Sequence, residues 1–392
     1  MSQSTKCTLS PPKRLLMGPG PSMVEPRVYA AMGQPIVGHL DPFFFQISEE
    51  IRALLAETFG TKNSFTLAIS GTGSAGMEAC VSNFVEDGSK MAVLANGFFC
   101  DRLTEMGKRQ GANVVRLEKP WGEIFSDDEA CDFIKREKPN VVAYVMAETS
   151  TGVVQPGKAL CEAAHDVGAL VIADCVTSLG TMPCNIDETG IDAAYSCSQK
   201  GMGAPPGLSP ITISPRALET LRGRTAVHKS WYLDLKLLDE YYGASHRYHH
   251  TAPISMFYAL REALEIIREE GLTARFARHE RNHKAFTAGA EAMGLEMLVK
   301  PGQRLWALNT PRVPEGVTDM AIRKRLMDGD GIEILGGFGP LAGKVFRIGI
   351  MGAGSREENV LLLLDKLEAA FRAEGYTPKG SGVEAARAFY SA

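Results

Sequence analysis

The sequence lacks the long apolar run that a membrane-spanning helix requires. No stretch approaches the ~20 consecutive apolar residues needed to cross a bilayer, and the opening residues, MSQSTKCTLSPPKRLL, contain no apolar core of a signal peptide. Basic residues are not in excess either: 42 Lys and Arg stand against 46 Asp and Glu, a net charge of −4. We therefore expect neither a membrane nor a nucleic acid as partner.

Cysteine is sparse and scattered. The eight cysteines form no CxxC pair and have no histidine at a spacing suited to zinc. They lie at positions 7, 80, 100, 131, 161, 175, 184 and 197. Reduced thiols of this kind are typical of a cytoplasmic protein. The sequence thus argues against a disulfide scaffold and a metal site, and it predicts a cytoplasmic location.

What the sequence does contain is the composition of a globular protein and a repeating α/β pattern. The 392 residues are 45% hydrophobic and 22% charged, enough to bury a large core. Between about 65 and 215, apolar runs that do not alternate are separated by helical stretches, which indicates strands buried on both faces. The predicted strands are 65–70, 91–96, 112–117, 140–147, 169–174, 193–198 and 208–214. This order predicts a mostly parallel, doubly wound sheet.

The rest of the chain divides around that sheet. Residues 1–16 are polar and then proline-rich, so we expect a loose arm that ends in the irregular MGPGP, giving an N-terminal arm over 1–21. The amphipathic helix predicted over 254–270 closes a large domain, 22–270. An α+β pattern follows, which predicts a smaller C-terminal domain over 271–392.

Glycines gather in ISGTGSAGMEA (69–79), where Gly71–Gly76 reads GxGxxG between a strand and a helix. Backbone N–H groups and the helix N-terminus would favour a phosphate there. A dinucleotide site would need an acid about 20 residues on, but the next strand ends in LANG. We keep a phosphate site and set aside an NAD oxidoreductase; a glycine-rich turn without a ligand is the other interpretation.

Two charged residues follow predicted strands further on. Asp174 ends ALVIAD, and Lys200 lies in YSCSQKGMGAPPG. Ligands of open α/β sheets bind beyond the carboxyl ends of the strands, although an N-cap aspartate and an exposed loop lysine are the ordinary alternatives. A lysine for an aldehyde, an acid for a pyridinium nitrogen and a phosphate loop together meet the needs of pyridoxal phosphate (PLP). Phe98 and Phe99, in ANGFFCDR, could stack on its ring or simply pack in the core.

The chain resembles class V (fold type I) PLP aminotransferases, in the alanine–glyoxylate and serine–glyoxylate/serine–pyruvate group. The resemblance runs from MGPGP to about residue 375. It is strongest in GPGP, ISGTGSAGMEA, ANGFF, AETSTGVVQP, ADCVTSLG, YSCSQKGMGAPPG, RYHHTAPISMFYALREAL and GKVFRIGIMG. It implies ping-pong transamination of a small amino acid, L-alanine or L-serine, with glyoxylate or pyruvate as the acceptor.

The resemblance also implies roles for cofactor-binding residues. Lys200 would bind the cofactor covalently as a Schiff base and then move the proton, and Asp174 would hold the pyridinium nitrogen. Phe99 stands where several relatives have tryptophan and would stack on the ring, with Thr149 on the ring side. The remaining residues would contact the phosphate: Thr72, Gly73, Ser74 and Gln199.

Other implied roles concern the substrate and a second subunit. Arg347, in VFRIGI, would bind the substrate α-carboxylate through its planar fork, and the GPGP backbone would line the substrate side near Gly20. Tyr248 and Thr251, in RYHHT, would reach the phosphate of the neighbouring subunit, which implies a homodimer with shared active sites. His39, in GHLDP, is a further candidate at the substrate mouth.

Several alternatives stay open within the family. A cysteine desulfurase would need a nucleophilic cysteine in the C-terminal part, and the last cysteine is Cys197. Ureidoglycine–glyoxylate aminotransferases are similar, but that branch has Gln at the position of His39 and Asn at that of Tyr248. Pyridoxamine–pyruvate transaminases match less well around 247–251. The neighbouring histidines His249 and His250 are interpreted as structural rather than as a metal site.

Overall fold

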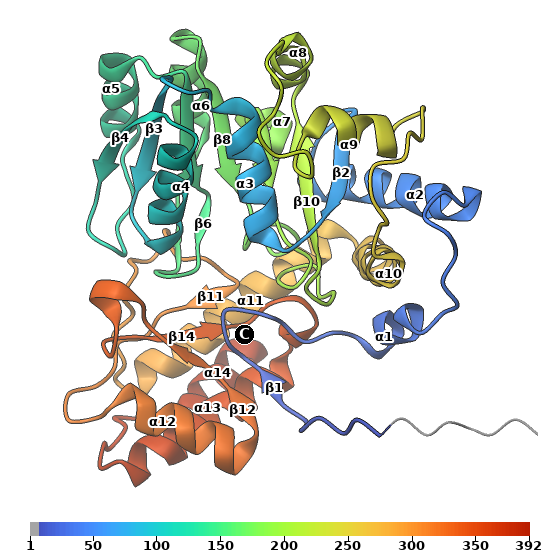
Figure 1. Ribbon diagram of the computed structural model, residues 1–392. Coiled ribbons are helices and arrows are strands. Elements are labelled where there is room, and N and C mark those ends of the chain that lie inside the picture. The colour runs from blue at the N-terminus through green and yellow to red at the C-terminus, as the bar shows by residue number, and fades with distance from the viewer. Residues whose placement is uncertain (1–7) are drawn as a thin grey trace, which may run out of the picture.

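A seven-stranded sheet organises the N-terminal two-thirds of the chain (Figure 1). The computed structural model describes residues 8–392, so Cys7 lies outside the described residues. The strands follow the order β2-β10-β9-β8-β5-β3-β4 and pair in parallel, except for the antiparallel β10. Their bounds are β2 Phe65–Ser70, β3 Lys90–Ala95, β4 Asn113–Glu118, β5 Val141–Val145, β8 Leu170–Asp174, β9 Ala193–Tyr195 and β10 Leu208–Ile213. The predicted mostly parallel α/β sheet is confirmed.

Helices connect the strands as the βαβ pattern requires. Some have explicit start signals: Ser126 and Glu129 form a reciprocal capping box at the start of α5, and Asp41 caps α2. The helices of this part are α1 Pro26–Met32, α2 Pro42–Phe59, α3 Gly73–Phe84, α4 Phe98–Arg109, α5 Asp127–Glu137, α6 Lys158–Asp166, α7 Ile186–Thr189, α8 Pro215–Gly223, α9 Leu235–Tyr242 and α10 Ile254–Glu270. No helix of residues 8–392 is long and apolar enough to cross a membrane.

The connection between β9 and β10 explains the one antiparallel strand. It comprises residues 196–207, here called the lysine loop, and contains no helix. A parallel neighbour would need a longer crossover connection, usually with a helix. The chain therefore turns back beside β9, and Lys200 lies at the turn.

The C-terminal part has its own small sheet and core. Three short strands pair in the order β11-β14-β13, and in Figure 1 β11 and β14 lie with α12–α14 below the ends of the strands of the large sheet. The elements of this part are α11 Leu272–Ala292, β11 Leu308–Asn309, α12 Asp319–Arg325, a π-helical turn Leu326–Asp330, β12 Ile332–Glu333, β13 Leu335–Gly336, β14 Phe346–Gly349, α13 Glu357–Ala373 and α14 Gly382–Ser391. The large part contains two further short strands, β6 Ala147–Glu148 and β7 Val153–Val154. One buried apolar cluster lies within positions 28–267, and a second comprises Met17 and residues between 285 and 386. From these clusters we propose the domain division at 270/271.

The arm differs from the loose segment that its composition predicts. Leu15 and Leu16 form β1 and pair in parallel with β12, and Met17 is fully buried in the C-terminal cluster. Apolar side chains directly after a polar, proline-rich stretch thus anchor the end of the arm to the far end of the chain.

Candidate active site

A cavity of about 220 Å³ lies at the carboxyl ends of the large sheet. Its walls come from the turn after β2, the start of α4, the ends of β5 and β8, and the lysine loop. Eight residues that the sequence singled out line it: Thr72, Gly73, Ser74, Phe99, Thr149, Asp174, Gln199 and Lys200. Residues separated by more than 120 positions therefore share one cavity.

The glycine-rich turn presents the start of α3 to this cavity. Thr72 is the N-cap residue, but its side chain makes no capping hydrogen bond. A Cβ on Gly73 would lie 3.1 Å from the Cβ of Cys197 and 3.2 Å from Val176, so little space is left for a side chain. Ala75 N donates to Thr72 O (2.8 Å). The N–H groups of Gly73 and Ser74 that precede it, together with the helix dipole, suit an anion.

Asp174 lies at the end of β8 and is 2% exposed. Its Oδ1 accepts a hydrogen bond from Val176 N (2.8 Å), and its Oδ2 accepts one from the Tyr195 hydroxyl (2.8 Å). Burial raises the pKa of Asp174 to about 6, against the opposing effect of these donors. A buried carboxylate held in this way is suited to a cationic partner.

Lys200 is 9% exposed, and burial lowers the pKa of its ammonium group. Ser22 fixes the backbone around it: its hydroxyl donates to Lys200 O (2.8 Å), and its N–H donates to Gln199 O. Gly20 packs against the side chain, because a Cβ there would lie 2.9 Å from Lys200 Cε. The GPGP segment thus adjoins the lysine, as the resemblance implies.

Arg347 lies on β14 and is 3% exposed. Its Nε donates to Gly336 O (2.7 Å), and its Nη1 is 3.5 Å from Thr149 O. Its guanidinium lies 3.8 Å from the ring centroid of Phe338, which in turn contacts Phe98. Burial lowers the pKa of Arg347 to about 10, so the group stays charged. A buried, oriented guanidinium beside the cavity is suited to a carboxylate ligand.

Sequence reasoning gave no role to Glu148, although it quoted the motif AETSTG. Glu148 is fully buried, and its Oε2 accepts a hydrogen bond from Phe99 N (3.1 Å) while Oε1 accepts one from Ser150 N (2.9 Å). Burial raises its pKa to about 7. Its contact with the first turn of α4 fixes the helix that carries Phe99.

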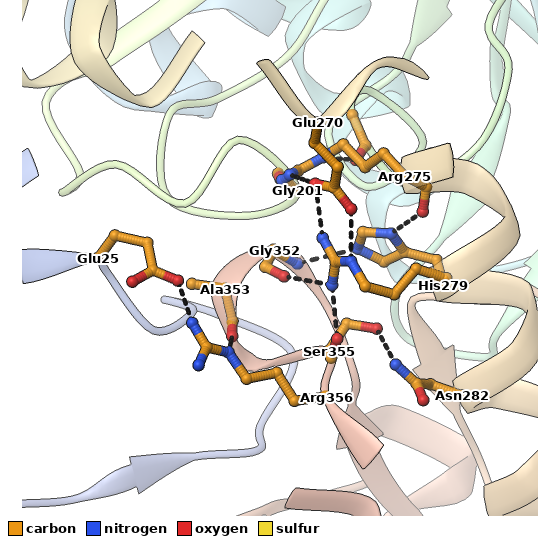
Figure 2. Close-up of polar contacts among 12 residues, drawn as sticks. Glu25, Gly201, Glu270, Arg275, His279, Asn282, Gly352, Ala353, Ser355 and Arg356 are labelled. Carbon is orange, nitrogen blue, oxygen red and sulfur yellow. Dashed lines mark hydrogen bonds and ion pairs between the residues drawn. The ribbon is translucent and has the colours of Figure 1, made fainter. Parts of the chain in front are cut away.

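Helix α11 ties the lysine loop to the loop that follows β14 (Figure 2). Arg275 Nη2 donates to Gly201 O (2.6 Å). One turn later, His279 Nε2 accepts a hydrogen bond from Gly352 N (3.0 Å). Burial lowers the pKa of His279 well below its ordinary value, which keeps the ring a neutral acceptor. One helix thus sets the spacing between the segments that carry Lys200 and Arg347.

Besides Gly20 and Arg347, which lie beside the cavity without lining it, three further predicted site residues lie outside the cavity of this subunit. Tyr248 is 57% exposed, and Thr251 is also exposed. The ring of His39 packs against that of Tyr248 in a tilted arrangement, with 5.0 Å between the ring centroids. None of the three lines the cavity. Their roles stay predictions that require a second subunit.

The neighbouring histidines form a directed hydrogen-bond chain. His249 Nε2 lies 3.2 Å from Trp231 O, an acceptor, so this nitrogen must carry the hydrogen. His249 Nδ1 then accepts from His250 Nδ1 (2.8 Å), and His250 Nε2 accepts from the Ser70 hydroxyl (2.6 Å). Within residues 8–392 no cluster of three or more His, Cys, Asp or Glu could hold a metal ion. The structural interpretation of the pair accounts for these contacts.

The chain matches the family model of class-V aminotransferases over residues 25–334. It belongs to the class-V aminotransferase family. It is 38% identical to the (S)-ureidoglycine–glyoxylate transaminase of Bacillus subtilis, over 98% of this chain and 95% of that protein. It is also 38% identical to the alanine–glyoxylate aminotransferase of rabbit, Oryctolagus cuniculus, with 93% of each chain covered. The chain is therefore a PLP-dependent transaminase, and the dinucleotide interpretation of GxGxxG is wrong.

Solved structures of class-V aminotransferases have the same fold. The alanine–glyoxylate aminotransferase of Nostoc sp. is 45% identical, with a TM-score of 0.92 over 94% of this chain and 98% of that one. The ureidoglycine–glyoxylate aminotransferase of Bacillus subtilis is 39% identical, with a TM-score of 0.96 over 98% of this chain and the whole of that one. The fold and the cofactor class are thus shared across nearly the whole chain.

The residues present fit PLP. Gln199 Oε1 and Thr177 Oγ1 are buried in the cavity lining and make no hydrogen bond among the described residues. Buried polar atoms of this kind require a partner. The start of α3 suits a phosphate, and Asp174 suits a ring cation. Thr177, which sequence reasoning did not assign, adds a hydroxyl directly beyond β8.

Proposed function

We propose that this transaminase transfers the amino group of L-alanine or L-serine to glyoxylate or pyruvate in a ping-pong reaction. Support comes from the names of its relatives, in which glyoxylate recurs as the acceptor with either alanine or ureidoglycine. The sequence at His39 and Tyr248 favours the alanine–glyoxylate group over the ureidoglycine group.

The observation that carries this proposal is the distribution of positive charge. Among the described residues that line the cavity, Lys200 and Arg102 are the cations. Arg102 contacts Ser74, on the side of the cavity where we expect the phosphate. Arg347 adjoins the cavity at the Thr149 carbonyl. Once Arg347 holds the α-carboxylate, no further cation among the described residues lines the cavity on the substrate side, and Arg323, whose charge acts on Arg347, is paired with Asp319 (2.9 Å). Small monocarboxylic substrates fit this arrangement.

The proposed roles of the chain's own residues follow from their chemistry. PLP, when bound, supplies an electron sink that stabilises negative charge at the substrate Cα. Asp174 holds a proton on the ring nitrogen through its buried negative charge. Lys200, with a pKa lowered by burial, holds the cofactor and then moves a proton at the substrate Cα. Phe99 and Thr149 orient the ring from their places in the cavity wall.

The phosphate contacts and the carboxylate contact fix the two ends of the site. Thr72, Gly73, Ser74 and Gln199 bind the phosphate at the start of α3, and Arg347 binds the substrate carboxylate from β14. Because the amino acid and the 2-oxo acid both bind the Arg347 guanidinium through a carboxylate, this one residue positions both substrates.

We further propose a homodimer in which Tyr248 and Thr251 reach the partner's phosphate. The exposure of both side chains supports this, since neither has a place in its own cavity. His39 would then approach the substrate mouth beside Tyr248. A cytoplasmic location is also proposed, because the seven described cysteines are all free thiols.

Ureidoglycine–glyoxylate transamination is the second candidate, since a relative with that name is 38% identical over almost the whole chain. Pyridoxamine–pyruvate transamination is a third; its structural neighbour from Mesorhizobium loti is 26% identical, with a TM-score of 0.91.

A half-reaction panel tests the proposal. The PLP-loaded enzyme is mixed separately with L-alanine, L-serine, (S)-ureidoglycine, pyridoxamine and L-aspartate, and loss of the cofactor's visible absorbance is followed. We expect rapid conversion with alanine or serine and slow conversion with aspartate. Conversion by ureidoglycine or pyridoxamine alone would establish the corresponding alternative, and a preference for aspartate would contradict the charge argument.

A further inference from the structure

Arg102 connects two walls of the cavity that the cofactor requires. It lies on α4, one turn after Phe99, and lines the cavity. Its Nη1 donates a hydrogen bond to Ser74 Oγ (2.9 Å), near the start of α3. Its guanidinium lies 5.1 Å from the ring centroid of Phe99 and 5.5 Å from that of Phe98. One side chain thus contacts both the predicted phosphate turn and the predicted ring-stacking residue.

The hydrogen-bond chemistry fixes the direction of the Ser74 hydroxyl. Guanidinium nitrogens donate and never accept, so Ser74 Oγ must be the acceptor in this contact. The hydroxyl hydrogen is then left available for a second acceptor. A phosphate oxygen in the cavity is an acceptor of the required kind, and a charged donor behind the hydroxyl strengthens the bond that the hydroxyl can make.

No carboxylate of the described residues forms an ion pair with Arg102, although its positive charge partly opposes the effect of burial on the pKa of Asp174. Arg102 makes no ion pair within residues 8–392, in contrast to most arginines of the chain. A phosphate ester carries about −1.5 to −2 charges at neutral pH. The other residues proposed to bind the phosphate in this subunit, Thr72, Gly73, Ser74 and Gln199, carry no charge. Arg102 is therefore the positive charge on the phosphate side of the cavity.

We propose that Arg102 is a positioning residue that makes the site selective for the phosphorylated cofactor, acting through Ser74. It holds the Ser74 hydroxyl so that its hydrogen points to the phosphate, and it supplies positive charge behind that contact. Its packing on Phe99 keeps the guanidinium in place. This inference concerns the cofactor and does not depend on which amino acid the enzyme prefers.

Comparison of PLP with pyridoxal, which lacks the phosphate, tests the inference. The full chain, freed of cofactor, is dialysed to equilibrium against each compound, and the dissociation constants of wild type and Arg102→Met are compared. Methionine keeps apolar cover over the phenylalanine rings but removes the charge and the donor. We expect PLP to bind about 10- to 100-fold more weakly to the variant, as for loss of a charged hydrogen bond, with pyridoxal affinity unchanged.

A control on the same helix separates this effect from loss of helix stability. Arg109 lies in the last turn of α4, its side chain is 75% exposed, and it pairs with Glu105. Arg109→Met should leave the affinity for both compounds unchanged. Arg102→Gln is a milder second variant, because the glutamine amide can still donate a hydrogen bond to Ser74. Its affinity for PLP should fall by less than that of Arg102→Met, and its affinity for pyridoxal should not change.

A double-mutant cycle tests the route through Ser74. In a Ser74→Ala background, Arg102→Met should weaken PLP binding much less than in the wild type. Additive losses would overturn the route through Ser74. Equal losses for PLP and pyridoxal in both Arg102 variants would show that Arg102 merely supports the ring stack and would overturn the proposal, as would unchanged PLP affinity.

Discussion

Replacing Arg347 by lysine should impair both half-reactions in similar proportion. Arg347 uses Nε for Gly336 O and approaches Thr149 O with Nη1, while Nη2 makes no hydrogen bond within residues 8–392. The contacts to the protein backbone therefore orient the fork and leave donors for a substrate. Lysine would keep the charge but lose the planar pair of donors and the stack on Phe338.

The magnitude follows from the strength of a charge-assisted hydrogen bond. Such a bond contributes about 1.5–3 kcal/mol, so its loss should lower kcat/KM by roughly 10- to 150-fold for each substrate. Because we propose that the amino acid and the 2-oxo acid both bind Arg347 through the same α-carboxylate, the two reductions should agree.

The assay measures each half-reaction separately by rapid mixing, first with the amino donor and then with the acceptor. Arg312→Lys is a matched control: Arg312 pairs with Glu296, its side chain is 41% exposed, and its backbone bridges to Val345 beside β14. That variant should react as the wild type does. If Arg347→Lys impaired the donor alone, the acceptor carboxylate would be bound elsewhere, and His39 and the GPGP loop would be examined first.

Four further predictions concern Lys200, Asp174 and the dimer. Lys200→Ala should abolish turnover but retain weak PLP binding, because the phosphate and ring contacts remain; dialysis and a turnover assay check this, and near-normal transamination would refute the assignment. Asp174→Asn should slow turnover by about 10- to 150-fold, because the charged contact to the ring nitrogen is lost; a rate change below tenfold would count against it. In the cofactor-free chain burial raises the pKa of Asp174 from 3.8 to about 6, so its ionisation destabilises the folded wild type as the pH rises through that range. The unfolding free energy of Asp174→Asn, relative to that of the wild type, should therefore increase from pH 4 to 6 in chemical denaturation. A difference that does not change with pH would contradict the burial argument. A Lys200→Ala chain coexpressed with a Tyr248→Ala, Thr251→Ala chain should regain activity through one intact site per mixed dimer, and no gain over either parent would refute a shared site.

Much of the fold follows from local patterns in the sequence. The strand predicted over 65–70 and the helix predicted over 254–270 match β2 and α10 residue for residue. Buried strands are continuous apolar runs, and an amphipathic helix has a distinct period, so both signals are local. The pairing of β1 with β12 was not predictable in this way, because two-residue strands carry no period and their partners are more than 300 positions apart. Helix α14 was also missed.

In the candidate site too, local sequence motifs were predictable and contacts between distant segments were not. Residues inside motifs, such as Asp174 and Lys200, were predicted because their residue types and places beyond strands carry chemistry. Arg102 and Glu148 were missed as members of the site. Arg102 contacts Ser74, and Glu148 contacts Phe99, only because α3, α4 and β6 pack together. The sequence signal that could have pointed to Arg102 is its place in α4, one helical turn after the ANGFF motif.

We propose that PLP binds to Lys200 in the cavity that Asp174 and the start of α3 enclose. The most direct test is to reduce the loaded enzyme with borohydride, which makes the link between cofactor and lysine permanent, and to locate the modified residue by mass spectrometry of the digested chain. We expect one modified peptide, containing the sequence YSCSQKGMGAPPG with the label on Lys200. A label on any other lysine, or no label in an enzyme that transaminates, would contradict it.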